Sequence, residues 1–312
     1  MSALVVTDQR SRSTKEEHRF SAMGTFVQVL VVGGRHGLVR DAEARIDELE
    51  SMWSRFRADS EVSLVNRLGS KRPVKVSPPT LQLIDRACLG WRLSEGAFDP
   101  TVLGAMHAAG YANSFAGSTC SPRAASDPQA APGCGGIMID RSTSTVRLDE
   151  GVGLDLGGIG KGFAADLVVN EISRAGAAGV LVNIGGDLVA RGETGEPGGW
   201  TVSIIEPSVS SEPFGTVAFD EGAVATSSAA KRRWETNLGR RHHLIDPETG
   251  ASRVGGPLLV SALACEGWLA EVTTKSLMAG QPAAAGLASV PSLAVSEEGQ
   301  VRLFAGMGEY LS

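Results

Sequence analysis

The sequence predicts an α+β fold, and three observations lead to that prediction. In some segments apolar residues recur every three or four positions, which indicates amphipathic helices. Other segments are short and rich in Val and Phe, which is typical of strands. Helices and strands follow one another without a regular βαβ alternation, and this disfavours a doubly wound parallel sheet.

The predicted helices depend on spacing and on their ends. A first helix begins at about Leu38, and its apolar residues stand three or four positions apart as far as Phe56. A second begins at Ser77-Pro78, because Ser is a favourable N-cap and the proline ring fixes φ near the helical value. It ends before Gly96. Two further helices are predicted at 161–175 and 270–279.

The predicted strands include one that glycine interrupts. Residues 180–190 are apolar except at Gly185-Gly186, where glycine indicates a bulge or a close backbone approach. Residues 112–136 are rich in Ala, Ser, Gly and Pro and are predicted to form a long surface excursion. The other predicted strands and hairpins cover 20–32, 137–148, 200–205, 216–219, 258–264 and 292–306.

Length and composition indicate an ordinary globular chain. Of its 312 residues, 42% are hydrophobic and 21% charged, and a net charge of −6 disfavours nucleic acid or an anionic membrane as the main partner. No apolar run is long enough for membrane insertion, and charge stands where a signal peptide needs an apolar region. We therefore expect a cytoplasmic protein with a mobile tail at 1–18 and a single domain at 19–312.

The segment LDLGGIGKGFAAD suggests a site for phosphate. Three glycines, Gly157, Gly158 and Gly160, precede a predicted helix, and the backbone N–H groups of such a turn favour an anion. Lys161 adds a point charge suited to a pyrophosphate. The segment is not a Walker A motif, because Gly162 stands where Ser or Thr would hold magnesium. A tight strand-to-helix turn with a solvated lysine is the alternative.

Six short segments stand out together by their order along the chain: SAMGTFVQV (21–29), SRFRADSEVSLVN (54–66), GAFDPTV (96–102), LDLGGIGKGFAAD (154–166), VNIGGDLVARG (182–192) and HHLIDPETG (242–250). Each resembles, in sequence and in order, a signature of the ApbE family of FAD:protein FMN transferases, and the resemblance covers roughly residues 20 to 308. The resemblance implies two interleaved α/β subdomains with FAD in the cleft between them. It also implies a reaction in which a Thr or Ser hydroxyl of an acceptor flavoprotein takes the FMN half of FAD and AMP leaves.

The resemblance also implies which residues contact the flavin. Met23, Gly24, Thr25 and Phe56 match positions that contact the isoalloxazine ring, a flat apolar group that suits flat or polarizable side chains. Asp99 matches a segment that lines the flavin site. Taken alone, Asp99 indicates a turn with a helix cap, and Met23 and Phe56 indicate ordinary core packing.

Further residues are implied near the FAD. Gly185, Gly186 and Asp187 match a segment beside the cofactor, and Asp187 is a candidate for a hydrogen bond to it or to another site residue. Ser227 and Ser228 match a region where the family often has Ser-Gly. Because Ser228 replaces that glycine, we expect a loop of different shape.

A histidine is the expected base. Its ordinary pKa lies near working pH, so it can take the proton of an acceptor hydroxyl. His243 matches the family's signature histidine, and Asp246 is expected either to orient it or to form a backbone turn. The alternative places His242 and His243 in a strand with one ring exposed and one packed. Lys161 and the glycines before it would hold the pyrophosphate.

The metal site of the family is the part that this chain alters. The family places an Asp at the start of a helix and a Thr one turn later, both binding magnesium, with a carbonyl that matches Gly160. This chain has Glu271 for the Asp and Lys275 for the Thr. Either Gly160, Glu271 and Thr274 still bind Mg²⁺, or a Glu271–Lys275 ion pair occupies that space.

Two other functions are compatible with the same segments. An FAD pyrophosphatase would use water as the acceptor and release FMN and AMP. A non-catalytic FAD-binding or delivery protein would leave FAD intact, and the altered metal helix favours that alternative.

Overall fold

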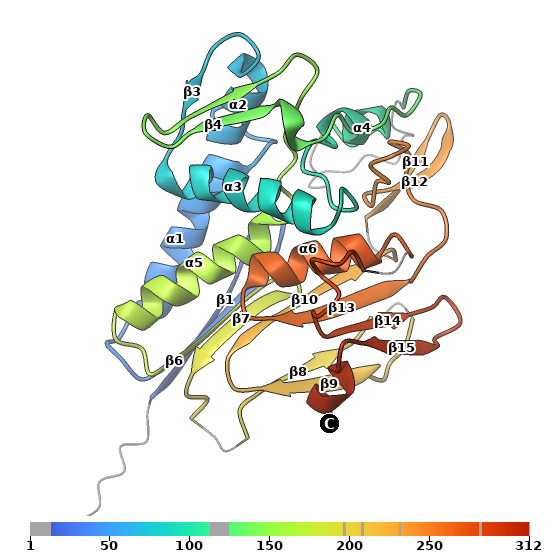
Figure 1. The fold of residues 1–312 in the computed structure, drawn as a ribbon. Helices are drawn as coiled ribbons and strands as arrows, with labels where there is room; N and C mark the ends of the chain where they lie inside the picture. Colours follow the sequence, from blue (N-terminus) through green and yellow to red (C-terminus); the bar gives the residue numbers. More distant parts are fainter. Residues whose placement is uncertain are drawn as a thin grey trace, which may run out of the picture.

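An eight-stranded antiparallel sheet is the largest element of the fold (Figure 1). The structure is a computed structural model that describes residues 14–112, 125–195, 198–206, 209–230, 232–280 and 283–311. In spatial order the strands are β1 (Lys15–Ala22), β2 (Thr25–Val32), β6 (Gly179–Ile184), β7 (Asp187–Gly192), β10 (Gly222–Ser228), β13 (Leu259–Ala264), β14 (Ser292–Val295) and β15 (Val301–Phe304). With helices packed beside this sheet, the α+β prediction is confirmed.

Three helices cover one face of the sheet: α1 (Leu38–Trp53), α5 (Gly160–Arg174) and α6 (Gly267–Leu277) (Figure 1). The apolar stripe predicted for α1 is buried along its whole length, and its Trp53 stacks on Phe163 of α5 with ring centroids 5.9 Å apart. Phe56, the last residue of the predicted stripe, lies beyond the end of α1 and is exposed.

The opposite face of the sheet is covered by two short strands, β8 (Trp200–Ile204) and β9 (Gly215–Phe219). Trp200 and Phe219 pack there against apolar residues of β7, β10, β13 and β14. The 3₁₀ helix η2 (Met307–Tyr310) closes this second core, and Met307 is fully buried in it.

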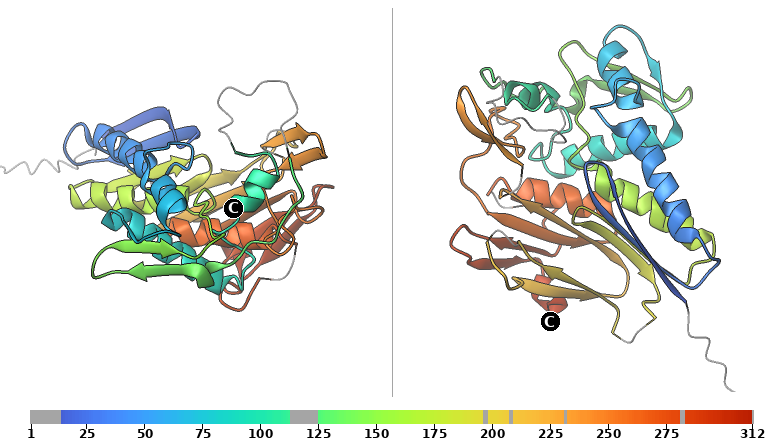
Figure 2. Two further views of the ribbon diagram at one scale, coloured as in Figure 1. Left: turned by 90° about the horizontal axis from the view of Figure 1, so that it is seen from above. Right: turned by 180° about the vertical axis from the view of Figure 1, so that it is seen from behind.

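A further layer lies beyond α1 and α6, as Figure 2 shows from above and from behind. It contains α2 (Glu61–Leu68), α3 (Pro78–Leu93), α4 (Leu103–Ala108), η1 (Cys134–Gly136), the sheet of β3 (Val74–Lys75), β5 (Thr145–Leu148) and β4 (Ile137–Asp140), and the hairpin of β11 (Arg233–Thr236) and β12 (Gly239–His242). Trp234 of that hairpin donates a hydrogen bond to the Ala109 carbonyl at 2.7 Å, which ties β11 to the end of α4.

Two tight turns correct the predicted strands. Residues 20–32 form two strands rather than one, because the chain reverses at Met23-Gly24 with φ of 52° and 67°. Gly185-Gly186 is likewise a hairpin turn between β6 and β7, with φ of 67° and 102°, rather than a bulge within a strand. Positive φ at both central residues is the geometry of the commonest two-residue hairpins.

The N-terminal boundary also differs from the prediction. β1 begins at Lys15, so residues 15–18 belong to the sheet and not to a tail. Residues 1–13 lie outside the described part of the chain. The same holds for residues 113–124 of the surface excursion predicted at 112–136; of its described residues, 125–133 have no helix or strand and 134–136 form a 3₁₀ helix.

The other predicted elements are confirmed within a few residues at their ends. They are the helices at 78–93, 161–175 and 270–279, the hairpins at 137–148 and 292–306, and the strands at 200–205, 216–219 and 258–264. The helix α3 begins after Ser77 as predicted, although the Ser77 hydroxyl donates to Glu61 and does not cap the helix.

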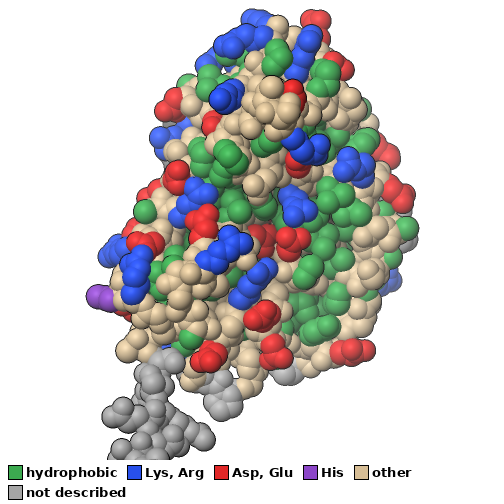
Figure 3. Space-filling view, turned by 60° about the vertical axis from the view of Figure 1, so that its left-hand side comes forward, with side chains coloured by type: hydrophobic (Ala, Val, Ile, Leu, Met, Phe, Trp, Pro, Cys, Tyr) green, Lys and Arg blue, Asp and Glu red, His purple; other side chains and the backbone are tan. Residues whose placement is uncertain are grey.

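The surface carries charges of both signs. On the face drawn in Figure 3, Lys and Arg side chains alternate with Asp and Glu, without a broad patch of one sign. No helix within the described ranges is both long and apolar enough to span a bilayer.

Candidate functional site

Two connected chambers open between the sheet and the layer above it. The large chamber has a volume of about 800 Å³ and lies among the β1–β2 turn, the end of α1 and the start of α5. The small chamber, of about 140 Å³, lies among the α3–α4 loop, the segment after β12 and α6. The volume of the large chamber is typical of a site for a small molecule. The chambers share Arg55, Phe56, Tyr111, Asp155, Gly157 and Arg232, so they form one cleft.

The glycine turn lies at the junction of the chambers. Gly157 lines both chambers, Gly158 the small one and Gly160 the large one, and α5 begins there without a side-chain cap. The N-terminus of a helix carries partial positive charge and therefore favours an anion. A Cβ on Gly158 would come within 3.2 Å of the Phe98 ring, so the close packing of the turn favours glycine.

Lys161 is held by two buried carboxylates. Its ammonium donates to Glu271 Oε1 at 2.6 Å and also to Asp187. Burial alone would lower the pKa of Lys161, but the charges of Asp187 and Glu271 outweigh burial and raise it above its ordinary value. Lys161 lines the large chamber, but its charge is already balanced by the two carboxylates within the protein. The alternative of a solvated lysine is wrong.

The two carboxylates behave differently. Burial would raise the pKa of Glu271, but Lys161 and Lys275 hold it below its ordinary value, and Glu271 Oε2 accepts a hydrogen bond from Gly162 N at 2.9 Å. Burial and the charge of Glu271 raise the pKa of Asp187, whose Oδ1 is buried without a hydrogen-bond partner. Asp187 does not line the cleft itself but holds Lys161, which does.

Lys275 reaches the small chamber from α6. Its ammonium donates to Ser227 Oγ at 2.9 Å and lies 3.6 Å from Glu271 Oε1. The predicted Glu271–Lys275 pair thus forms, but Glu271 lies closer to Lys161. Ser227 and Ser228 do not appear on the cleft wall: Ser227 holds Lys275, and Ser228 Oγ accepts from Ala230 N at 3.1 Å.

The residues expected to bind Mg²⁺ do not fit that ion. The Thr274 hydroxyl donates to the Glu271 carbonyl at 2.8 Å and meets Ser227 Oγ at 2.7 Å, so it is already engaged in hydrogen bonds within the protein. In the described part of the chain, no group of three or more His, Cys, Asp or Glu side chains could hold a metal ion. The structure therefore gives the set of Gly160, Glu271 and Thr274 no support as a metal site, and Glu271 is an ion-pair partner of Lys161 and Lys275 here.

His243 faces the small chamber as a neutral base. Burial, followed by the charges of Arg232 and Lys275, lowers its pKa well below the ordinary value, and its Nδ1 is buried without a hydrogen-bond partner. Both ring nitrogens of the adjacent His242 instead form hydrogen bonds with backbone groups: Nε2 with the Arg253 carbonyl at 2.7 Å, and Nδ1 with Leu244 N, from which it accepts.

Asp246 forms a turn and does not orient His243. Its Oδ1 accepts from Glu248 N at 2.9 Å and from Thr249 N at 3.3 Å. Of the two expectations for Asp246, the structure supports the backbone turn.

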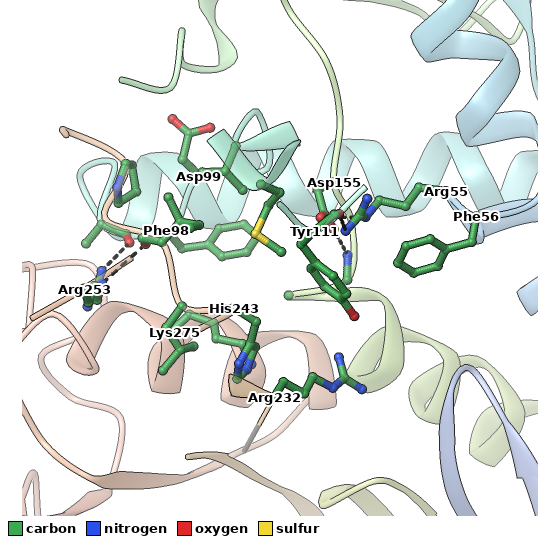
Figure 4. Close-up of a pocket in the computed structure, with 18 residues that line it drawn as sticks. Arg55, Phe56, Phe98, Asp99, Tyr111, Asp155, Arg232, His243, Arg253 and Lys275 are labelled. Carbon is green, nitrogen blue, oxygen red and sulfur yellow. Dashed lines mark hydrogen bonds and ion pairs between the residues drawn. The ribbon is translucent and has the colours of Figure 1, made fainter. Parts of the chain in front are cut away.

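Aromatic residues line both chambers, and Figure 4 shows those of the small one. The Phe56 and Tyr111 rings lie 5.7 Å apart, and the Arg55 guanidinium lies over both, 4.3 Å from the first centroid and 4.8 Å from the second. The exposure of Phe56 rules out the core-packing alternative for that residue. Met23, Gly24 and Thr25 line the large chamber.

Sequence reasoning missed the ion pair that supports these aromatics. Arg55 Nε lies 2.9 Å from Asp155 Oδ2, both side chains are buried, and Asp155 Oδ1 accepts from Gly157 N at 2.9 Å. One carboxylate thus joins the aromatic wall to the glycine turn. Both residues stand in segments that carry the family resemblance, but a lone Arg and a lone Asp give no spacing signal.

Of the remaining predicted residues, Asp99 lines the cleft, whereas Gly185 and Gly186 lie behind its wall. Asp99 lines the small chamber, burial raises its pKa, and its Oδ1 accepts from Thr101 N at 2.7 Å, so the expected turn is present as well. Gly185 and Gly186 do not line the cleft. A Cβ on Gly185 would come within 2.5 Å of Thr25 Oγ1, so this turn supports the β1–β2 turn from behind.

Comparison with known proteins shows the family of this chain. The sequence model of the ApbE family matches residues 23–295, which is most of the length of the chain. The chain belongs to the ApbE family.

Curated proteins similar to this ApbE chain are named FAD:protein FMN transferase. One from Klebsiella pneumoniae (strain 342) is 28% identical over 212 residues, which cover 66% of this chain and 63% of that protein. One from Rhodobacter capsulatus is 30% identical over 272 residues, which cover 83% of this chain and 50% of that protein. The chain thus matches between half and two thirds of the length of these relatives.

Solved structures show the same ApbE fold. The ApbE protein from Thermotoga maritima superposes with a TM-score of 0.83 at 23% identity, covering 96% of this chain and all of that one. The flavin transferase ApbE from Vibrio cholerae superposes with a TM-score of 0.78 at 22% identity and the same coverage.

Proposed function

We propose that this protein is an FAD:protein FMN transferase, which moves the FMN half of FAD onto a Thr or Ser hydroxyl of an acceptor flavoprotein and releases AMP. One observation carries the proposal: a neutral histidine lines the same small chamber as a glycine turn and a lysine ammonium. A base beside a cationic, glycine-lined anion site is the arrangement that hydroxyl attack on a phosphate requires.

The lining of the cleft supports FAD as the substrate. Phe56, Tyr111 and Met23 offer flat or polarizable surfaces for the flavin ring. The turn at 157–160 and the N-terminus of α5 offer backbone N–H groups to the pyrophosphate. A ring site and an anion site in one cleft suit a molecule that carries both.

The reaction assigns a role to each group. The hydroxyl oxygen of the acceptor forms a bond to the FMN-side phosphorus while its proton passes to His243. The bond from that phosphorus to the bridging oxygen breaks, and the oxygen leaves as part of AMP. Lys275 and the glycine turn balance the phosphate charge, and the rigid cleft holds the two reactants in line.

One experiment tests the function against its two rivals. The protein is incubated with FAD and a candidate acceptor flavoprotein, and flavin fluorescence on the denatured acceptor and free AMP are measured. Fluorescent acceptor with an equal amount of AMP supports the proposal. AMP and FMN without labelled acceptor indicate a pyrophosphatase, and intact FAD with neither product indicates a binding or delivery protein.

A cytoplasmic location and the absence of membrane insertion or nucleic-acid partners stay predictions from the sequence.

A further inference from the structure

Four charged side chains form a closed cluster between α5, α6 and β7. Asp187 and Glu271 contribute two negative charges, and Lys161 and Lys275 contribute two positive charges. All four are at least four-fifths buried, so each charge requires a partner. The cluster is electrically balanced without any added ion.

The two lysines of this cluster are not equivalent. Lys161 lies between two carboxylates, and both hold it by direct hydrogen bonds. Among the described residues, Lys275 has one carboxylate at 3.6 Å and a hydrogen bond to the neutral hydroxyl of Ser227. Lys275 therefore has the less compensated charge, and burial lowers its pKa below the ordinary value although Glu271 opposes that shift. An anionic ligand would stabilise its ammonium form.

The side chain of Lys275 also lies against the glycine turn. A Cβ on Gly158 would lie 3.9 Å from Lys275 Cε, and both residues line the small chamber with His243. Figure 4 shows Lys275 beside His243, on the side of the chamber opposite Asp99. The ammonium therefore lies where the phosphate that His243 serves would be bound.

A divalent cation has no suitable donor set at this place. Glu271 Oε1 accepts from Lys161, Oε2 accepts from Gly162 N, and the Thr274 hydroxyl is committed to Ser227 and a carbonyl. Mg²⁺ prefers six oxygen ligands at about 2.0–2.1 Å and usually takes one or two of them from carboxylates, the rest from waters and phosphates. Here both oxygens of the Glu271 carboxylate already accept hydrogen bonds within the protein, and two added charges would upset the balance of the cluster before a ligand arrives.

We propose that Lys275 is a built-in cation that replaces a divalent metal at the pyrophosphate, so that this protein binds and uses FAD without Mg²⁺. The inference rests on the proposed function in taking the pyrophosphate of FAD as the ligand. The oxygens of Ser227 and Glu271 hold the ammonium before the ligand arrives, so little side-chain ordering remains to be done on binding.

The test measures FAD affinity directly, apart from transfer. Metal-free protein is titrated with FAD in excess EDTA and then in excess MgCl₂, and metal content is measured by mass spectrometry. We expect the wild-type Kd to agree within about twofold between the two buffers, and Lys275→Met to weaken it by about tenfold or more, the effect of one charge-assisted hydrogen bond. Lys75→Met, at an exposed lysine of β3, is the matched control and should leave Kd unchanged.

Two further variants keep the test decisive. Lys275→Arg retains the charge and should retain binding in EDTA, which covers the case in which Lys275→Met fails to fold. The Glu271→Asp, Lys275→Thr double variant should bind FAD tightly only with Mg²⁺. The inference, but not the function, is overturned if the wild type holds stoichiometric Mg²⁺ and its affinity for FAD falls at least tenfold in EDTA. A wild type that binds no FAD in either buffer overturns both.

Discussion

At the scale of single residues, the cleft separates two kinds of charged group. Lys161 forms ion pairs with Asp187 and Glu271 inside the protein, whereas His243 and Lys275 line the small chamber. A sequence shows that a lysine follows a glycine-rich turn, but its partners lie 26 and 110 residues away. The anchoring role of Lys161 therefore could not be predicted from spacing.

Replacing the proposed base tests the residue scale first. We expect His243→Ala to lower the transfer rate by about 10²–10⁴-fold and to leave FAD affinity nearly unchanged, because a general base acts on the transition state. Single-turnover labelling of the acceptor measures the rate, and fluorescence quenching measures the Kd. His36→Ala, at an exposed surface histidine, is the control. Transfer at the wild-type rate would assign the base to another group.

The depressed pKa of His243 predicts the pH dependence of the rate. The base must be neutral, and burial lowers the pKa of His243 well below 6.5. Activity should therefore stay on its plateau as pH falls through 6.5 and decline only below the depressed pKa. A rate profile whose acid limb is centred at or above 6.5 would contradict this assignment.

The same shift has a cost in stability at acid pH. Below 6.5 the unfolded chain binds a proton that native His243 does not, so the free energy of unfolding falls as pH falls through that region. In thermal melts across this range, the melting temperature of His243→Asn should fall less with decreasing pH than that of the wild type. Because burial also lowers the pKa of His242, the difference between the two proteins isolates His243.

At the scale of elements, the long helices α1, α3, α5 and α6 were predicted, whereas the short helices α2 and α4 were missed. The stripe of α1 repeats over four turns, so the signal is strong in the sequence and its residues are buried in the structure. β10, a central strand that supplies Ser227, was missed because its residues are mostly small and give no alternation. The Met23-Gly24 turn was missed because a methionine with positive φ has no signature in the sequence.

The crossing of α5 and α6 depends on glycine. A Cβ on Gly162 would come within 2.4 Å of the Gly267 carbonyl, and Asp166 of α5 accepts from Gly267 N and Trp268 N at the start of α6. This close crossing brings the Glu271 carboxylate to Lys161. The positions of both lysines in the cleft thus depend on how near the two helices lie.

We expect Gly162→Ala to destabilise the protein by about 1–3 kcal/mol, because the backbones must separate to admit one methyl group. Chemical denaturation gives the free energy of unfolding. Gly104→Ala is the matched control: Gly104 lies in α4 with nothing within 4 Å of an added Cβ, so that change should be neutral or slightly stabilising. Equal stability of the two variants would show that the crossing tolerates a wider separation.

At the scale of the whole molecule, the cleft gathers residues from distant parts of the chain. Met23 comes from the first hairpin, Phe56 from the end of α1 and Lys275 from α6 near the other end of the sequence. The family resemblance indicated most of these segments without showing which of them meet. Tyr111 was missed because it lies at the edge of a segment whose composition predicts only a loop.

This arrangement predicts that FAD binds more tightly than FMN or riboflavin, because only FAD engages both the aromatic wall and the complete pyrophosphate site. Fluorescence quenching with the three ligands measures the Kd values. Phe56→Ala should weaken FAD and riboflavin alike, by about two- to tenfold for a lost ring contact. Lys275→Met should weaken FAD and leave riboflavin unchanged, because riboflavin has no phosphate. Equal affinities for all three ligands, or a Lys275→Met variant that loses riboflavin as well, would mean that the cleft recognises only the flavin ring and that the turn at 157–160 has no anion to bind.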